Sequence, residues 1–294
     1  MTTRIGWVLA ASMMLSIVLA SCSKDTNPPP AKPGASTGPA GGQASGAPQT
    51  GQPILVYVGG TMEPAVKVLA ERWQKKTGQQ VQLDAADSGV CLVKIDKAKQ
   101  GDLYISHAPF PAAARKKSYA DQSYVVATLS PVIVVAKGNP KGIKGLKDLA
   151  AEGLKVGLTD EKYSTLGYVA PKMFDKAGTR AAIEKNVVVR QRSGGGVANE
   201  VVLGHLDAAI VWDAVAFLRK ERLDTVPIEA DYRLQSGVDT VTSATYGPMD
   251  MGKIDVEAQT LKFSQQPAQA KAFAEFLAGD EGAEVFKSFG FSPK

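Results

Sequence analysis

Four short turns in this chain combine small residues with hydroxyl-bearing ones, and each turn precedes a segment with helical periodicity. The turns are Gly59-Gly60-Thr61, Asp87-Ser88-Gly89, Tyr163-Ser164-Thr165-Leu166-Gly167 and Ser193-Gly194-Gly195-Gly196. A helix N-terminus presents backbone amides without partners and a partial positive charge, and hydroxyl groups add neutral hydrogen-bond donors. This combination suits a small multivalent oxyanion that is bound without a charged counter-group. Serine, threonine and glycine are also common caps and turn formers, so a single turn of this kind predicts no ligand.

A second group of residues, Asp87, Cys91, His107 and Asp213, suggests a different ligand. Thiolate, imidazole and carboxylate together suit a transition-metal cation. Cys91 stands in the first turn of an expected helix, where a thiol should have a lowered pKa. No metal-ligand spacing motif connects the four residues. The favoured interpretation is therefore a small buried cysteine and a hydrogen-bonded loop histidine, with the metal site as the alternative.

Catalysis is a third possibility, and few residues could perform it. The chain has two histidines, and Cys91 with His107 is the visible nucleophile–base pair. The His-Glu-x-x-His and phosphate-binding lysine-loop motifs are absent from the sequence, and Gly-x-Ser-x-Gly is absent from the predicted body at residues 53–294. We therefore predict a binding protein that needs no cofactor, with a hydrolytic or thiol enzyme as the less favoured alternative.

Strands and helices alternate along the predicted body, and this alternation would position the turns. Ile54–Val58 is a short apolar run typical of a strand, and Val81–Ala85 is a second expected strand. Between them, Met62–Trp73 repeats apolar residues at helical spacing. The same order continues to closing helices at 268–277 and 281–289. Alternation of this kind predicts an α/β fold with mainly parallel sheets covered by helices. Ligands of such sheets bind beyond the carboxyl ends of the strands, where the four turns are expected to lie.

The first 52 residues resemble targeting and linking segments rather than a folded domain. Residues 5–20 form an apolar run that is short for a membrane span and follows a positive charge, as in a secretory signal. The string Leu19-Ala20-Ser21-Cys22 resembles the bacterial lipobox, whose cysteine receives lipid. Residues 22–52 are rich in proline, glycine and serine and could not bury enough surface to offset their ordering entropy. We therefore expect a signal peptide at 1–21, a disordered tether at 22–52, and a protein of the cell envelope that is anchored outside the cytoplasm to a membrane by lipid on Cys22.

The charge of the chain is mildly positive, at +5 for the full sequence and about +4 without residues 1–21, which include Arg4. The basic residues are scattered and form no block interleaved with aromatic residues, so we expect no nucleic-acid partner. A mild positive field would help to collect anions. With Cys22 lipidated, Cys91 has no partner for an intramolecular disulfide. We expect the protein to be a monomer.

Several stretches of the body resemble the type II periplasmic binding proteins, and particularly the molybdate- and tungstate-binding subfamily. The stretches are Val68–Gly78, Asp87–Gly89, Gly101–Ser106, Val134–Ile143 and Ala270–Phe291. Val134–Ile143 is similar to the crossover segment of that family, and Ala270–Phe291 is similar to its C-terminal helices. These stretches are distributed along nearly the whole body, from Val68 to Phe291.

The resemblance implies two lobes, each a mainly parallel sheet flanked by helices, joined by crossing strands that act as a hinge. Lobe one would comprise residues 53–134 and 243–294, and lobe two would comprise residues 135–242. The lobes would close over a solute and deliver it to the permease subunits of an ABC importer. The implied ligand is a small oxyanion, with molybdate or tungstate favoured.

The positions that match the binding turns of the family supply the implied ligand residues. They are Gly60, Thr61, Ser88 and Gly89 from lobe one, and Ser164, Thr165, Leu166, Val197, Trp212 and Asp213 from lobe two. The family often has paired serines in its first turn, and a tyrosine hydroxyl where this chain has Trp212 or Asp213. Trp212 can donate only through its indole nitrogen. Asp213 would repel an anion unless it is protonated or ligates the metal centre of the oxyanion directly, a role also open to Glu200.

Overall fold

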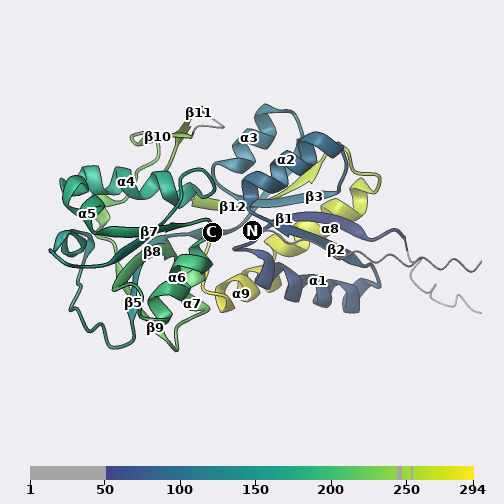
Figure 1. Ribbon diagram of the computed structural model, residues 1–294. Coiled ribbons are helices and arrows are strands. Elements are labelled where there is room, and N and C mark those ends of the chain that lie inside the picture. The colour runs from purple at the N-terminus through teal and green to yellow at the C-terminus, as the bar shows by residue number, and fades with distance from the viewer. Residues whose placement is uncertain (1–50, 244–246, 253) are drawn as a thin grey trace, which may run out of the picture. The chain divides into compact units, whose positions relative to one another are not determined.

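A computed structural model describes residues 51–243, 247–252 and 254–294 (Figure 1). The predicted signal peptide, Cys22 and the predicted tether up to residue 50 lie outside the described residues. Within the described ranges, no helix has the length and the apolar character that crossing a membrane requires. The described residues form two five-stranded sheets flanked by helices, which confirms the predicted α/β fold.

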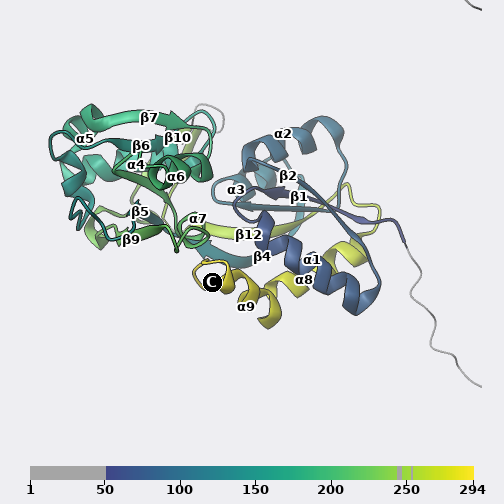
Figure 2. The ribbon, with the colours of Figure 1, turned by 60° about the horizontal axis from the view of Figure 1, so that its bottom comes forward.

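The first sheet has the strand order β2-β1-β3-β12-β4. Its strands are β1 (Ile54–Gly59), β2 (Val81–Ala86), β3 (Leu103–His107), β4 (Ala120–Leu129) and β12 (Ile254–Leu261). Four of these strands point the same way, and β12 runs antiparallel between β3 and β4. Helices cover both faces of the sheet (Figure 2). They are α1 (Glu63–Thr77), α8 (Pro267–Ala278) and α9 (Asp280–Ser288) on one face, and α2 (Ser88–Ala98) and α3 (Phe110–Lys116) on the other.

The second sheet has the strand order β7-β6-β8-β5-β9. Its strands are β5 (Pro131–Ala136), β6 (Val156–Thr159), β7 (Val187–Gln191), β8 (Ala208–Trp212) and β9 (Leu223–Pro227). Four strands again share one direction, and β5 runs antiparallel to β8 and β9. The helices of this part are α4 (Thr165–Ala177), α5 (Arg180–Asn186), α6 (Gly194–Val202), α7 (Asp213–Phe217) and the 3-10 turns η1 (Leu146–Ala150) and η2 (Ala230–Tyr232). Figure 1 shows α4 on one side of the strands and α6 on the other.

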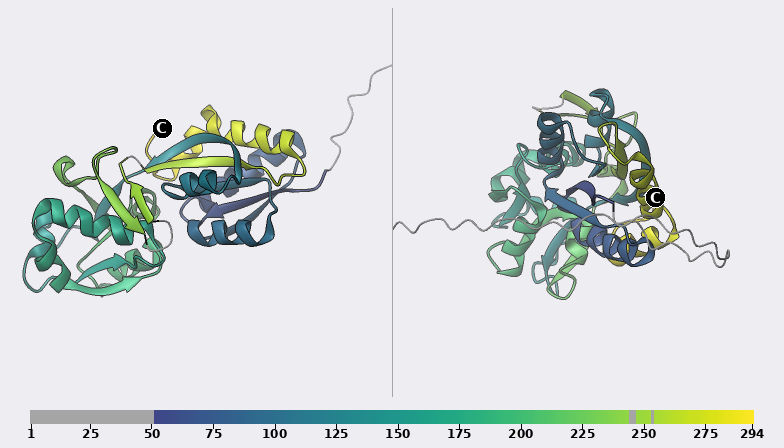
Figure 3. Two further views of the ribbon diagram at one scale, coloured as in Figure 1. Left: turned by 90° about the horizontal axis from the view of Figure 1, so that it is seen from above. Right: turned by 90° about the vertical axis from the view of Figure 1, so that its right-hand side faces the viewer.

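The chain crosses between the two sheets twice. On the way out, Ser130 separates the end of β4 from the start of β5. On the way back, the hairpin of β10 (Thr240–Ser243) and β11 (Gly247–Asp250) precedes β12, which pairs with β4 (Figure 3). The lobe limits predicted from the sequence, after residues 134 and 242, fall inside β5 and β10.

Local sequence explains where the first helix of the body begins and ends. Pro64 occupies its first turn, where the amide of a residue has no intrahelical partner, and Gly78 ends it with a φ of 76°. The buried residues Ala65, Val66 and Leu69 form the face that packs on the first sheet. The N-cap of α1 is Met62, without a side-chain cap bond. The preceding hydroxyl of Thr61 is therefore not used as a cap.

Candidate functional site

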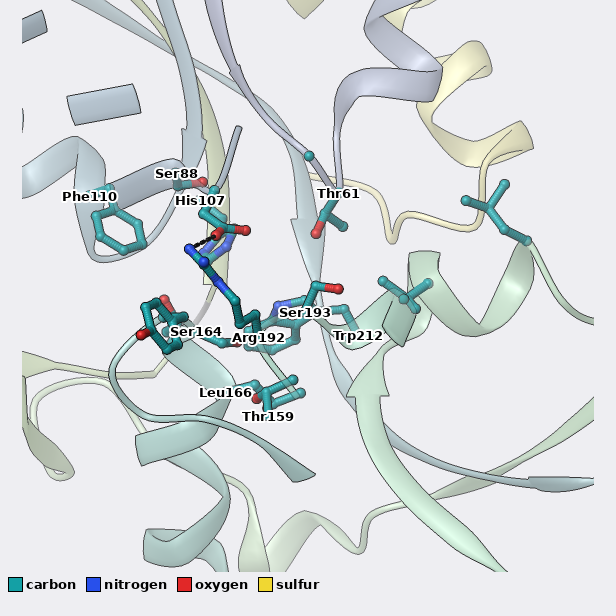
Figure 4. Close-up of a pocket in the computed structure, with 18 of the residues that line it drawn as sticks. Thr61, Ser88, His107, Phe110, Thr159, Ser164, Leu166, Arg192, Ser193 and Trp212 are labelled. Atoms are coloured by element: carbon teal, nitrogen blue, oxygen red, sulfur yellow. Dashed lines mark ion pairs between the residues drawn. The ribbon is translucent and has the colours of Figure 1, made fainter. Parts of the chain in front are cut away.

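A cavity of about 290 Å³ lies between residues of the two sheets (Figure 4). The first sheet and its connections supply Gly60, Thr61, Asp87, Ser88, His107 and Phe110, which we call the first wall. The second supplies Thr159, Tyr163, Ser164, Thr165, Leu166, Arg192, Ser193, Gly194, Gly195, Trp212, Val215, Leu218 and Arg219, which we call the second wall. Six of these residues end a strand or directly follow one, namely Gly60, Asp87, His107, Thr159, Arg192 and Trp212. Because the carboxyl ends of parallel strands share one edge of a sheet, residues far apart in sequence meet here.

Three helices begin at the cavity and present their N-terminal residues to it. Ser88 begins α2, Thr165 begins α4, and Gly194 begins α6. The Oγ atom of Ser193 caps α6 by accepting a hydrogen bond from the Gly196 amide at 3.2 Å. Its hydroxyl proton remains available for a ligand. The amides and dipoles at three helix starts favour a negative charge in the cavity.

Seven of the predicted ligand residues line this one cavity. They are Gly60, Thr61, Ser88, Ser164, Thr165, Leu166 and Trp212. The structure places Gly89, Val197 and Asp213 elsewhere. Val197 is fully buried and packs against Gly157 of β6, so the turn before α6 faces the cavity instead. Asp213 accepts hydrogen bonds from the Ala214 amide at 2.9 Å and from the Ser292 hydroxyl at 3.1 Å, which hold its carboxylate outside the cavity.

Thr159, the last residue of β6, lines the cavity although its sequence context did not single it out. Its side chain is 2% exposed, and its hydroxyl has no hydrogen-bond partner among the described residues. A buried hydroxyl without a partner costs about 1–3 kcal/mol of folding free energy. An acceptor atom on a bound ligand would satisfy it.

Arg192 brings a full positive charge to the cavity, which the expectation of a site without a charged counter-group did not include. Its guanidinium lies 4.2 Å from the ring centroid of Tyr163 and 4.0 Å from the carboxylate of Asp87. The contact with Asp87 joins the two walls and is drawn as a dashed line in Figure 4. Arg192 directly precedes the Ser193–Gly196 turn, and this adjacency is the sequence signal that could have predicted it.

Arg219 brings a second positive charge from a position after α7. Its Nε donates to Asn199 Oδ1 at 2.8 Å, and its terminal nitrogens donate to the carbonyls of Val215 at 3.1 Å and Gly195 at 3.3 Å. Partial burial lowers the pKa of Arg219 from its usual value, but an arginine stays protonated in proteins. These bonds fix the guanidinium beside the start of α6.

Asp87 and His107 give the first wall a different character, because both offer acceptor atoms. His107 Nδ1 lies 2.8 Å from the Ala108 carbonyl, so Nδ1 carries the proton of the neutral ring and Nε2 keeps a lone pair. Burial lowers the pKa of His107 and keeps the ring neutral, and the ring contacts Phe110 and Trp212 edge-on. Burial also raises the pKa of Asp87, and the charge of Arg192 opposes this shift.

The four residues of the alternative metal site do not come together. Among the described residues, no group of three or more histidine, cysteine, aspartate or glutamate side chains could hold a metal ion. Cys91 is fully buried, and its thiol lies 3.5 Å from the Val58 carbonyl. Burial raises its pKa to about 11, so the lowered pKa expected from its place in the first turn of α2 is wrong. Cys91 does not line the cavity with His107, so the structure does not assemble the nucleophile–base pair either.

A comparison with protein families gives one match that spans most of the chain. The family described as "Bacterial extracellular solute-binding protein" matches residues 54–292. A relative from Haemophilus influenzae named "Putative binding protein" is 22% identical over 241 residues, which are 82% of this chain and 91% of the relative. "Molybdate-binding protein ModA" from Mycobacterium tuberculosis is 25% identical over 285 residues, which are 96% of this chain and 95% of that protein.

Solved structures share the fold at low sequence identity. The periplasmic molybdate-binding protein of Azotobacter vinelandii has a TM-score of 0.65 and is 16% identical, and the match covers 82% of this chain and 99% of that one. At a TM-score of 0.61, the similar structures include a sulfate-binding protein of Mycobacterium tuberculosis and an iron-bound protein of Pseudomonas aeruginosa. They are 20% and 17% identical and cover 83% and 82% of this chain, and 87% and 86% of their own chains. The fold therefore occurs with several ligands.

Proposed function

Because this chain belongs to the bacterial extracellular solute-binding proteins, we propose that it is a receptor that binds a small oxyanion in the cavity between its two sheets and delivers it to an ABC permease. The membership confirms the resemblance predicted from the sequence. The family and the relatives are solute-binding proteins and not enzymes, so the enzyme alternative is dropped.

The observation that carries the proposal is the set of donors around the cavity. Three helix N-termini, the guanidinium groups of Arg192 and Arg219, and the unpaired hydroxyl of Thr159 line the same space. Each of them gains from an anion with several acceptor oxygens. A cation would meet two arginines and few acceptors there, so the alternative of a transition-metal receptor has less support.

Molybdate and tungstate are the first ligands to test. Relatives named for molybdate binding span nearly the full length of this chain, and the four turns predicted for such an anion contribute eleven residues to the cavity. The space is large enough for a tetrahedral anion, since each water-sized oxygen occupies roughly 30 Å³.

Thermal unfolding with a panel of ligands tests the proposal. The panel contains molybdate, tungstate, sulfate, phosphate, Zn²⁺ and Cu²⁺, each added to the full-length protein in mild detergent. An oxyanion at about a hundred times its dissociation constant should stabilise the protein by roughly 2.7 kcal/mol, and therefore raise the Tm by about 5–10 °C. A panel in which no oxyanion raises the Tm, while a metal ion does, would reject the oxyanion receptor.

We also propose that lipid on Cys22 anchors the protein to a membrane outside the cytoplasm. The support is the sequence Leu19-Ala20-Ser21-Cys22 and the long polar segment after it. The Cys22→Ser variant should move from the membrane fraction to the soluble fraction. Equal membrane retention of the two proteins would contradict the anchor.

We also propose that two lobes close over the ligand. Lobe one comprises residues 53–134 and 243–294, and lobe two comprises residues 135–242. The support is that residues from both sheets line one cavity and that strands cross between the sheets. Small-angle scattering should show a smaller radius of gyration with a bound oxyanion than without it. Identical profiles at saturating ligand would contradict closure.

A further inference from the structure

The charged donors of the cavity and the acceptor groups of Asp87 and His107 lie on opposite walls. The charged donors, Arg192 and Arg219, belong to the second wall, while the carboxylate of Asp87 and the neutral ring of His107 belong to the first. A fully ionised oxyanion offers acceptor atoms only, so it can satisfy the second wall but brings no hydrogen to the first. An anion that retains a hydrogen on one oxygen can satisfy both.

The carboxylate of Asp87 becomes available to a ligand when its ion pair with Arg192 opens. It is the N-cap residue of α2, but its side chain makes no cap bond there. Its ion-pair partner is Arg192, at 4.0 Å, and the side chain of Arg192 is mostly exposed. An anion that draws Arg192 towards itself would therefore leave the Asp87 carboxylate facing the ligand. A fully ionised oxygen of the ligand beside this carboxylate would be repelled by it. An O–H group of the ligand would instead donate a charge-assisted hydrogen bond to the carboxylate.

His107 supports the same preference from the adjacent strand. Its Nδ1–H group is used by the Ala108 carbonyl, so the nitrogen left for a ligand is an acceptor. The ring is held between Phe110 and Trp212, at centroid distances of 5.8 Å and 5.7 Å, and lines the cavity. When Arg192 turns to the anion, the first wall therefore holds two acceptor groups, from β2–α2 and β3, that a donor hydrogen on the ligand can satisfy.

From this arrangement we propose that Asp87, assisted by His107, selects oxyanions that carry a donor hydrogen, such as hydrogen phosphate, over fully ionised ones of the same shape, such as sulfate. The inference rests on the proposed function, since it requires an oxyanion in this cavity. The donors of the cavity do not by themselves rank one oxyanion above another, and the inference adds such a ranking. Molybdate and tungstate are fully ionised at neutral pH, so the rule ranks them below a hydrogen-carrying anion of the same shape, but it does not remove them from the oxyanions that the second wall can bind.

Isothermal titration of the full-length protein with phosphate and with sulfate at pH 7.5 tests the rule, because the two anions have the same shape and differ in the hydrogen. The wild-type protein should bind phosphate at least about tenfold more tightly than sulfate, the typical gain of one charge-assisted hydrogen bond over repulsion. In Asp87→Asn, sulfate should gain affinity and the phosphate-to-sulfate ratio should fall by about tenfold or more. The asparagine side chain keeps the size of the aspartate, and no cap bond is lost because Asp87 makes none.

The matched control is Asp84→Asn, which removes the same charge from β2. Asp84 pairs with Lys94 at 2.5 Å and does not line the cavity, so its substitution should leave the ratio unchanged. Equal affinities of the wild-type protein for phosphate and sulfate, with Asp87→Asn shifting both alike, would overturn the rule and leave the oxyanion receptor standing. If tungstate, sulfate and phosphate all fail to bind, the proposed function fails, and the rule fails with it.

Discussion

The first and second walls of the cavity are built by the same kind of βα turn, yet they carry opposite charges. Among the described lining residues, the charged group of the first wall is Asp87, and those of the second wall are Arg192 and Arg219. Both walls also present hydroxyl groups at helix starts, such as Ser88 and Thr165. The hydroxyls and amides are thus common to the two walls, and the difference lies in side chains that the turn geometry does not require.

Because of this difference, we expect the second wall to set how tightly oxyanions bind and the first wall to set which oxyanions are preferred. The second wall can attract any anion, because its arginines and unpaired Thr159 hydroxyl need only acceptor atoms. We expect the first wall to distinguish among anions, because its carboxylate attracts a ligand oxygen that carries a hydrogen and repels one that is fully ionised. Variants of the second wall should therefore weaken all oxyanions together, and variants of the first wall should change their order.

Removing both arginines should have the largest effect. A hydrogen bond to a charged group contributes about 1.5–3 kcal/mol, so Arg192→Gln with Arg219→Gln should weaken every oxyanion that binds by roughly a hundredfold or more. Titration with tungstate and with phosphate measures the loss. Arg190→Gln is the matched control, since Arg190 lies on the same strand, β7, but pairs with Glu184 outside the cavity. Retention of affinity within about threefold in the double variant would mean that the second wall does not provide the charge.

Removing two hydroxyls of the first wall should have a moderate effect. Neutral hydrogen bonds contribute about 0.5–1.5 kcal/mol each, so Thr61→Ala with Ser88→Ala should reduce oxyanion affinity roughly tenfold and shrink the ligand-induced Tm shift accordingly. The control is Ser288→Ala, whose hydroxyl donates to the Val285 carbonyl away from the cavity. An unchanged Tm shift in the double variant would remove these hydroxyls from the binding site.

Thr159→Val should separate binding from stability. The hydroxyl of Thr159 has no partner in the described structure, so its loss should not lower the Tm of the free protein, while oxyanion affinity falls about fivefold to tenfold. Thr128→Val is the opposite case, because Thr128 donates to the Pro293 carbonyl at 3.1 Å outside the cavity. That variant should lose stability and keep its affinity. A lowered Tm with unchanged affinity in Thr159→Val would show that the hydroxyl serves the fold.

Cys91, which lies behind the first wall, should have the smallest effect on binding. Cys91→Ala should change oxyanion affinity by less than about twofold, because the thiol contacts backbone carbonyls and not the cavity. With a pKa of about 11, the native thiol should react with a thiol reagent at pH 8 roughly a hundredfold more slowly than in the unfolded chain. The Cys22→Ser chain makes Cys91 the single thiol for this measurement. Rapid reaction in the native protein would show that the Cys91 thiol is accessible to solvent, and would contradict its burial behind the first wall.

Several parts of the fold and the site could be predicted because their signals are local. Alternation of apolar runs with helical periodicity predicted the α/β fold. Because ligands of such sheets bind beyond the carboxyl ends of the strands, the turns after β1, β2 and β6 were expected at one site. The strand β12 was not predicted. Its residues show no local mark of a pairing partner, and its place between β3 and β4 depends on segments more than 120 residues away.

The site residues that were missed or misplaced depend on the same long-range packing. Arg219 reaches the cavity from the end of α7, and nothing within its own segment indicates that Asn199 and Gly195 will fix it there. Cys91 occupies a helix start, which by itself favours the thiolate. The helix packs that position against β1, and the resulting burial outweighs the effect of the helix start on the pKa.

Backbone geometry and residue periodicity act within a few turns of chain, so the sequence alone could predict many of the strands and helices and the turns rich in hydroxyl groups. Which charges meet in the cavity depends on the tertiary structure. The contact of Asp87 with Arg192 and the unpaired hydroxyl of Thr159 arise where strand ends from two sheets face each other. Coulomb and desolvation effects act between groups that are close in space, whatever their separation along the chain.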